Sequence, residues 1–143
     1  MKSSVILSTA LVLSLIIVSC KTDTGRDRED IVSTEREFAI MAGEAGVAEA
    51  FYHFAADSAV ILRGGKLIRG REAIRDYYNQ NLKPGTKLLW APDYADVSGD
   101  LGYTYGRYTH QVPDSTGNII ESHGMFHTVW KRQPDGAWRF VWD

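Results

Sequence analysis

The last third of the chain, residues 99–142, constrains the fold most. It contains three runs of aromatic and β-branched residues, separated by the turn sequences PDSTGN (113–118) and QPDG (133–136). Such runs, bounded by Pro, Asp, Asn and Gly, are typical of antiparallel strands joined by turns. We therefore expect a three-stranded meander, and one face of that sheet must be covered by another layer.

The preceding residues supply that layer. Residues 28–42 and 47–55 place apolar side chains at helical spacing, and residues 71–81 do the same. A short strand at 59–62 turns back through the sequence RGGK (63–66), and Pro92 indicates a bulge or an edge in a strand over 87–97. The order α-α-β-β-α-β-β-β-β predicts an α+β fold in which three helices pack on one face of a curved antiparallel sheet.

Composition narrows the class of protein. The chain has 143 residues, of which 44% are hydrophobic, so it can bury the core of one domain. Its net charge is -2, and no stripe of Lys and Arg gives it the electrostatic footprint of a nucleic-acid-binding protein. The chain contains one cysteine, which excludes an intrachain disulfide.

The N-terminus has the pattern of a targeting segment. After Lys2, residues 5–18 are dominated by Leu, Ile and Val, a run shorter than the roughly 20 residues that span a membrane. The run ends in the sequence IVSC at Cys20 and resembles the lipobox of bacterial lipoproteins. That resemblance implies that residues 1–19 are a signal peptide and that Cys20 is lipidated. The alternatives are an ordinary secretory signal and an N-terminal membrane anchor.

This N-terminus predicts where the protein resides. Residues 21–30 (KTDTGRDRED) are polar and lack apolar periodicity, so we expect residues 20–30 to form an acylated, flexible tether. Several acyl chains on one residue give stable attachment to a membrane. We therefore expect a membrane-anchored lipoprotein of the bacterial cell envelope, on the periplasmic side or the cell surface, with one domain over residues 31–143.

Four phrases in that domain resemble a known family. They are FAADSAV (54–60), GREAI (70–74), VWKR (129–132) and DGAWRF (135–140). Together with the element order they resemble the nuclear transport factor 2-like superfamily, with its SnoaL-like and ketosteroid-isomerase-like branches. The resemblance implies a cone-shaped α+β fold, a deep pocket between the concave face of the sheet and the helices, and frequent dimers through the sheet. It implies no single activity, because this fold hosts both enzymes and binding proteins.

The isomerase branch offers the sharpest comparison. Matching the phrases by eye places Leu62 where that branch has its carboxylate base and Phe38 where it has its oxyanion-binding tyrosine. Neither side chain can exchange a proton, so we do not expect ketosteroid-isomerase chemistry.

Strand alternation gathers the remaining candidate site residues on one face of the meander. Tyr103, Tyr105 and Arg107 alternate on one strand, and His123 and His127 alternate on the next. If this face lines the pocket, it binds a polar or anionic small molecule, with His123, His127 and Tyr105 as candidate catalytic groups. If it is the outer face, it is solvated or forms a dimer. Alternation leaves both interpretations open.

Two further residues are candidates for the pocket. Glu35 shares the apolar stripe of the first helix, and a buried Glu35 would need a partner such as an Arg or Trp donor. Trp90 is expected in the core and the pocket wall. His123 and His127 lie about 13 Å apart along a strand, too far to share a metal ion, so we expect neither a metal nor another cofactor.

The sequence leads to one main functional hypothesis and two alternatives. The main hypothesis is a lipid-anchored envelope protein that binds a small molecule or a partner protein without catalysis. The first alternative is a cofactor-independent enzyme of isomerase, dehydratase or hydrolase type that uses the His, Tyr and Arg side chains above. The second is a structural module that forms a homodimer through the sheet.

Overall fold

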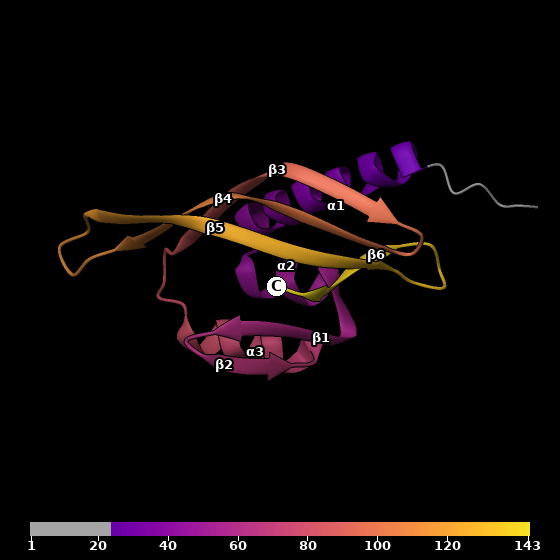
Figure 1. Ribbon diagram of the computed structural model, residues 1–143. Helices are drawn as coiled ribbons and strands as arrows, with labels where there is room; N and C mark the ends of the chain where they lie inside the picture. The colour runs from indigo at the N-terminus through magenta and orange to yellow at the C-terminus, as the bar shows by residue number, and fades with distance from the viewer. Residues whose placement is uncertain (1–23) are drawn as a thin grey trace, which may run out of the picture.

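The computed structural model describes residues 24–143 and contains three helices and six strands (Figure 1). These are α1 (Thr24–Glu44), α2 (Val47–Phe54), β1 (Ala55–Arg63), β2 (Lys66–Arg69), α3 (Arg71–Asn81), β3 (Lys87–Ser98), β4 (Leu101–Pro113), β5 (Ile119–Arg132) and β6 (Trp138–Trp142). The predicted element order is confirmed. Within residues 24–143 no helix is long and apolar enough to cross a membrane. The predicted signal peptide and Cys20 lie outside the described residues.

The six strands form one curved sheet in the order β2-β1-β6-β5-β4-β3. Four of the neighbouring pairs are antiparallel, but β1 and β6 run parallel. The sheet is therefore mixed, whereas the sequence predicted an antiparallel one. Pairing between strands this far apart in the chain leaves no local pattern in either strand, which is why the sequence did not reveal it.

The helices cover the concave side of the sheet. Figure 1 shows the long strands β3, β4 and β5 arching over α1 and α2, with the β1–β2 hairpin and α3 opposite them. Phe38 of α1 is 1% exposed at the centre of the core, with ring centroids of Phe51 at 4.7 Å and Trp90 at 4.9 Å. Aromatic packing of this kind, with each ring burying a large apolar area, holds the helices to the sheet.

Helix α1 begins earlier than the sequence predicted. Residues 24–30, expected to be flexible tether, form its first turns. Asp27 is buried and pairs with Arg132, whose guanidinium carbon lies 4.6 Å from the centroid of the Trp138 ring. The ion pair, supported by the cation–π contact of Arg132, thus fixes residues 24–30 against the sheet. These residues show no apolar helical pattern, so the sequence did not predict this part of the helix.

The predicted strand irregularity at Pro92 is confirmed, and it explains a glycine. The register of β3 against β4 shifts between Pro92 and Tyr94, opposite Gly106. A Cβ on Gly106 would lie 2.2 Å from the carbonyl oxygen of Ala91 and 2.9 Å from the nitrogen of Asp93. The bulged strand can approach this closely only because position 106 has no side chain.

Candidate functional site

The structure decides which face of the meander the helices cover. Thr104, Thr128 and Trp130 are fully buried on the concave side. Centring the hairpin on its turn at 113–118 predicts a pairing of Gly106 roughly with Gly124, whereas the two strands pair Gly106 with Phe126, two residues away. A slip of two residues preserves the faces, because side chains alternate with a period of two.

The candidate site residues therefore share the convex face, as the register pairs Tyr105 with His127 and Thr109 with His123. His123, His127 and Arg107 are exposed, and Arg107 contacts Asp93 at 3.4 Å. The interpretation that Tyr103, Tyr105, Arg107 and His123 line the pocket is wrong, and the alternative of an outer face is correct. Alternation fixes which residues share a face but not which face is covered.

Aromatic rings form a continuous patch on this outer side. Tyr94 stacks on Tyr105 with centroids 5.3 Å apart, and Tyr103 lies 5.8 Å from the ring of His127. Met125, at the same level on β5, is 61% exposed. We call these five residues the convex aromatic face.

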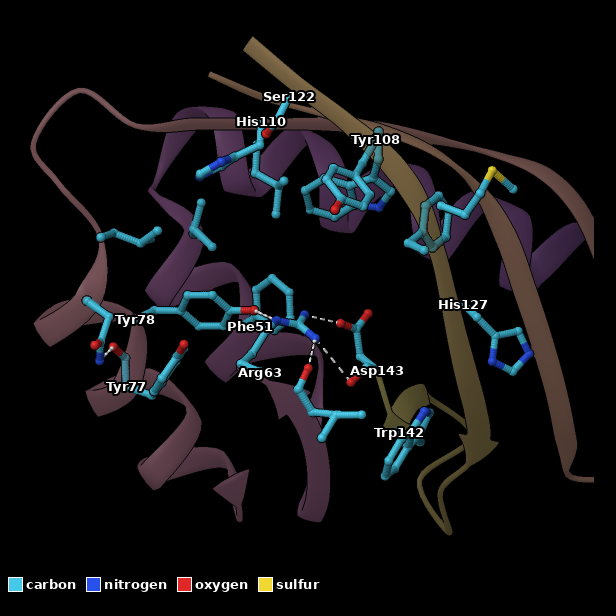
Figure 2. A pocket seen from close by; sticks show the side chains of 18 residues that line it. Phe51, Arg63, Tyr77, Tyr78, Tyr108, His110, Ser122, His127, Trp142 and Asp143 are labelled. Atoms are coloured by element: carbon cyan, nitrogen blue, oxygen red, sulfur yellow. Dashed lines mark hydrogen bonds and ion pairs between the residues drawn. The ribbon is translucent and has the colours of Figure 1, made fainter. Parts of the chain in front are cut away.

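A cavity of about 610 Å³ lies on the concave side, between α2 and α3, the ends of β1 and β6, and the strands β3 to β5 (Figure 2). Its aromatic lining includes Phe51, Tyr77, Tyr78, Trp90, Tyr108 and Phe126. Its polar lining includes Arg63, Asn81, His110, Ser122 and Asp143. His127 also borders it, but Figure 2 shows the His127 ring beyond β5 on the side away from Arg63. Of the other ligand-binding residues predicted from sequence, Trp90 lines this cavity.

Three lining residues, Arg63, Tyr78 and Asp143, form a polar cluster at the cavity (Figure 2), and Thr128, which is not part of the lining, is hydrogen-bonded to it. The Arg63 guanidinium forms an ion pair with the Asp143 carboxylate, and its Nε donates to the Tyr78 hydroxyl oxygen at 3.0 Å. Thr128 Oγ1 donates to Asp143 Oδ2 at 3.1 Å. We call these residues the Arg63 cluster; its two charges neutralise each other.

The main chain also fixes Asp143. Its N–H donates to the Val60 carbonyl at 3.1 Å, and its carbonyl accepts from the Leu62 N–H at 3.0 Å, which extends the parallel pairing of β1 and β6. Sequence patterns did not point to Arg63, which lies in the predicted turn RGGK, or to Asp143. One signal was available: alternation places Arg63 on the same side of its strand as Ile61, which is fully buried.

Glu35 lies behind the cavity wall, in a buried network of its own. Its side chain is 0% exposed, and it accepts from Trp90 Nε1 at 2.6 Å, Thr104 Oγ1 at 2.5 Å and Trp130 Nε1 at 3.1 Å. The expectation that a buried Glu35 needs a donor such as Trp is confirmed. Burial raises the pKa of the Glu35 carboxyl to about 7, although the hydrogen bonds from Thr104, Trp90 and Trp130 oppose the increase.

Glu35 therefore contacts the cavity only through another residue. Trp90 lines the cavity with Glu35 bound to its indole nitrogen, whereas Glu35 is not part of the lining. This makes Glu35 a positioning residue for the wall. Leu62 lies at the position matched to the isomerase base, and Phe38 at the position matched to its tyrosine. Neither side chain can transfer a proton. Among residues 24–143 no group of three His, Cys, Asp or Glu side chains could hold a metal ion.

The fold of this chain is similar to that of several solved structures. No family model matches the chain, and no curated protein matches it. Among solved structures, an NTF2-like protein with a cystatin-like fold from Novosphingobium aromaticivorans is 22% identical, with a TM-score of 0.66 over 82% of this chain and 79% of that one. An NTF2-like superfamily protein from Salmonella enterica is 14% identical, with a TM-score of 0.68 over 82% and 88%.

The chain has the nuclear transport factor 2-like fold. The association domain of the C. elegans protein CaMKII is also similar, with 19% identity and a TM-score of 0.63 over 83% of this chain and 94% of that domain. The predicted cone-shaped α+β class is thus confirmed. At these identities the likeness concerns the fold alone, and the function must be argued from the site.

Proposed function

We propose that the chain binds a small molecule in the concave cavity without changing it chemically, as a protein anchored to the bacterial cell envelope by a lipid on Cys20. The cavity carries this proposal. Its volume of about 610 Å³ is that of a typical ligand site, and aromatic rings with a few convergent polar groups line it. The anchor rests on the sequence of residues 1–20.

The polar groups of the cavity favour binding over catalysis. Arg63 and Thr128 already hold the Asp143 carboxylate, and burial raises the pKa of the Tyr78 hydroxyl, which keeps it protonated. The half-buried His110 is a possible base, but it has no hydrogen-bond partner among residues 24–143 to orient it. A general base normally needs such an orienting group. The enzyme alternative based on His123, His127 and Tyr105 loses support, because His123 and Tyr105 do not line the cavity and His127 only borders it.

A ligand screen with two matched variants tests the proposal. Leu88 lines the cavity, whereas its neighbour Leu89 is 46% exposed. We expect ring compounds that raise the melting temperature of the full chain to lose this effect with Leu88→Trp, which fills the cavity, and to retain it with Leu89→Trp. A library without a single hit, or hits insensitive to Leu88→Trp, rejects the cavity as a binding site.

The same hits separate binding from catalysis. Each hit is incubated with the protein and recovered for mass spectrometry. An unchanged compound supports a binding protein. A product that forms with the wild type but not with Leu88→Trp supports the enzyme alternative and rejects binding without catalysis.

A second candidate function is self-association through the convex aromatic face. Exposed aromatic and apolar side chains gathered on one sheet face are typical of interaction surfaces. Here Tyr94 and Tyr105 are 44% and 38% exposed, and Met125 lies beside them. The partner that this surface fits best is a second copy of the chain, because stacked tyrosines facing their own equivalents bury apolar area on both sides.

A further inference from the structure

We infer that the cavity selects an uncharged ring compound bearing an oxygen atom, and that Asp143 imposes this selection as a counter-ion built into the site. The inference deepens the proposed function and rests on it. It is drawn from the donors, acceptors and charges of the Arg63 cluster.

The hydrogen-bonding capacity of Arg63 is almost fully used. A guanidinium has five N–H donors. Nε donates to Tyr78, Nη1 donates to the carbonyls of Leu62 at 3.0 Å and Asp143 at 3.3 Å, and Nη2 donates to the Asp143 carboxylate. One N–H on Nη2 remains, and the Arg63 side chain is 29% exposed where it lines the cavity. Arg63 can therefore donate one hydrogen bond to a ligand but cannot form a bidentate pair with a ligand carboxylate.

Tyr78 supplies a second donor beside it. Its oxygen accepts from Arg63 Nε at 3.0 Å, and its hydroxyl hydrogen has no acceptor among residues 24–143. Tyr78 is 5% exposed and lines the cavity. Two donors on adjacent side chains suit one ligand oxygen with two lone pairs, as in a carbonyl or a hydroxyl group.

The charge balance argues against an anionic ligand. Asp143 is 11% exposed in its side chain and already occupies the guanidinium that a ligand carboxylate would seek. An incoming carboxylate would place two like charges on one cation in a partly buried site, which is unfavourable. Turning the Asp143 side chain away would break its ion pair with Arg63 and its hydrogen bond from Thr128. An uncharged oxygen uses the free donors without either penalty.

The walls favour rings over chains. Phe51, Trp90, Tyr108 and Phe126 approach the cavity from α2, β3, β4 and β5. Planar aromatic walls on several sides hold a flat, rigid ligand at low entropic cost. The ligand class is therefore a compact aromatic or alicyclic molecule whose oxygen reaches the Arg63 cluster.

Three probes of one shape test the selection with the full chain. They are 2-naphthol, 2-naphthamide and 2-naphthoate, measured at neutral pH by calorimetry. We expect both uncharged probes to bind the wild type at least about tenfold more tightly than naphthoate. Asp143→Asn frees the guanidinium, so the preference should shrink by about tenfold or reverse. The control Asp76→Asn, exposed on α3, should leave it unchanged.

Each outcome decides between the two claims. A wild type that binds naphthoate as tightly as the uncharged probes overturns the inference and leaves the proposed function standing. An unchanged preference in folded Asp143→Asn also overturns the inference. If Asp143→Asn does not fold, the wild-type ratio of naphthamide to naphthoate still decides. A wild type that binds none of the three overturns the inference, and the ligand screen described above decides whether the proposed function falls with it.

Discussion

Glu35 should make the stability of the protein depend on pH in an unusual direction. Burial raises the pKa of this carboxyl from 4.5 to about 7 in the folded chain. The folded state thus holds the proton more tightly than the unfolded state. The stabilising contribution is fully present below pH 4.5 and is lost as the pH rises toward 7, which is the reverse of the usual behaviour of an ion-paired carboxylate.

The magnitude follows from that interval. Each pH unit between the two pKa values corresponds to about 1.4 kcal/mol, so the increase from 4.5 to about 7 amounts to about 3 kcal/mol of unfolding free energy. Replacing Glu35 by Gln keeps the shape of the side chain and removes the titration. The wild type should therefore lose about 3 kcal/mol relative to Glu35→Gln between about pH 4.5 and pH 8.

Urea unfolding at several pH values measures this difference directly. Every other titrating group cancels when Glu35→Gln is subtracted from the wild type at each pH. The control is Glu37→Gln on the same helix, where the replaced carboxylate is exposed and accepts from Ser33 Oγ at 3.2 Å. A wild type whose stability, relative to Glu35→Gln, stays flat or rises with pH would refute a buried, proton-retaining Glu35.

Three further perturbations test other parts of the structure. Gly106→Ala should cost about 3 kcal/mol of unfolding free energy, because its Cβ would lie 2.2 Å from the Ala91 carbonyl oxygen, whereas Gly43→Ala, with open space in α1, should stabilise by up to about 1 kcal/mol. Met125→Glu should convert a dimer to a monomer in light scattering, since Met125 lies in the convex aromatic face. Cys20→Ala should abolish labelling by a fatty-acid probe in a bacterial host.

Each of these has a contradicting result. Equal stabilities of the two alanine variants would mean that β3 does not approach position 106 closely. A wild type that is monomeric at all concentrations tested would remove the dimer proposal. Labelling that survives Cys20→Ala would exclude lipidation at that residue.

The features that the sequence predicted are those with a short-range pattern. The helix at Arg71–Asn81 was predicted to the residue, and the bulge at Pro92 follows from a missing N–H donor. That a buried Glu35 needs a donor partner, such as an Arg or a Trp, was predicted from the cost of an unsatisfied carboxylate. In each case a few neighbouring residues, or one chemical requirement, carry the information.

The features that it missed depend on pairing at long range. Arg63 and Asp143 are 80 residues apart, and only the parallel contact of β1 with β6 brings them together. The polar face with Tyr105 and His127 was assembled correctly but could not be assigned to a side, because nothing in those strands encodes where α1 packs. Residues 24–30 show no hydrophobic periodicity, because they are held by an ion pair between Asp27 and Arg132 and not by an apolar stripe.

The position of β6 in the sheet has a consequence for how the chain reaches its folded state. Strands β3, β4 and β5 follow one another in the chain and can pair as consecutive hairpins, and β1 can pair with β2 across a tight turn. Within the described sheet, β6 is the strand that joins these two groups. Before it arrives, β1 presents an unpaired edge, which is a known route to aggregation. The sheet therefore stays open along β1 until β6 pairs with it, and closing a loop of this length is slow. Assistance from a holding chaperone would matter most in that interval.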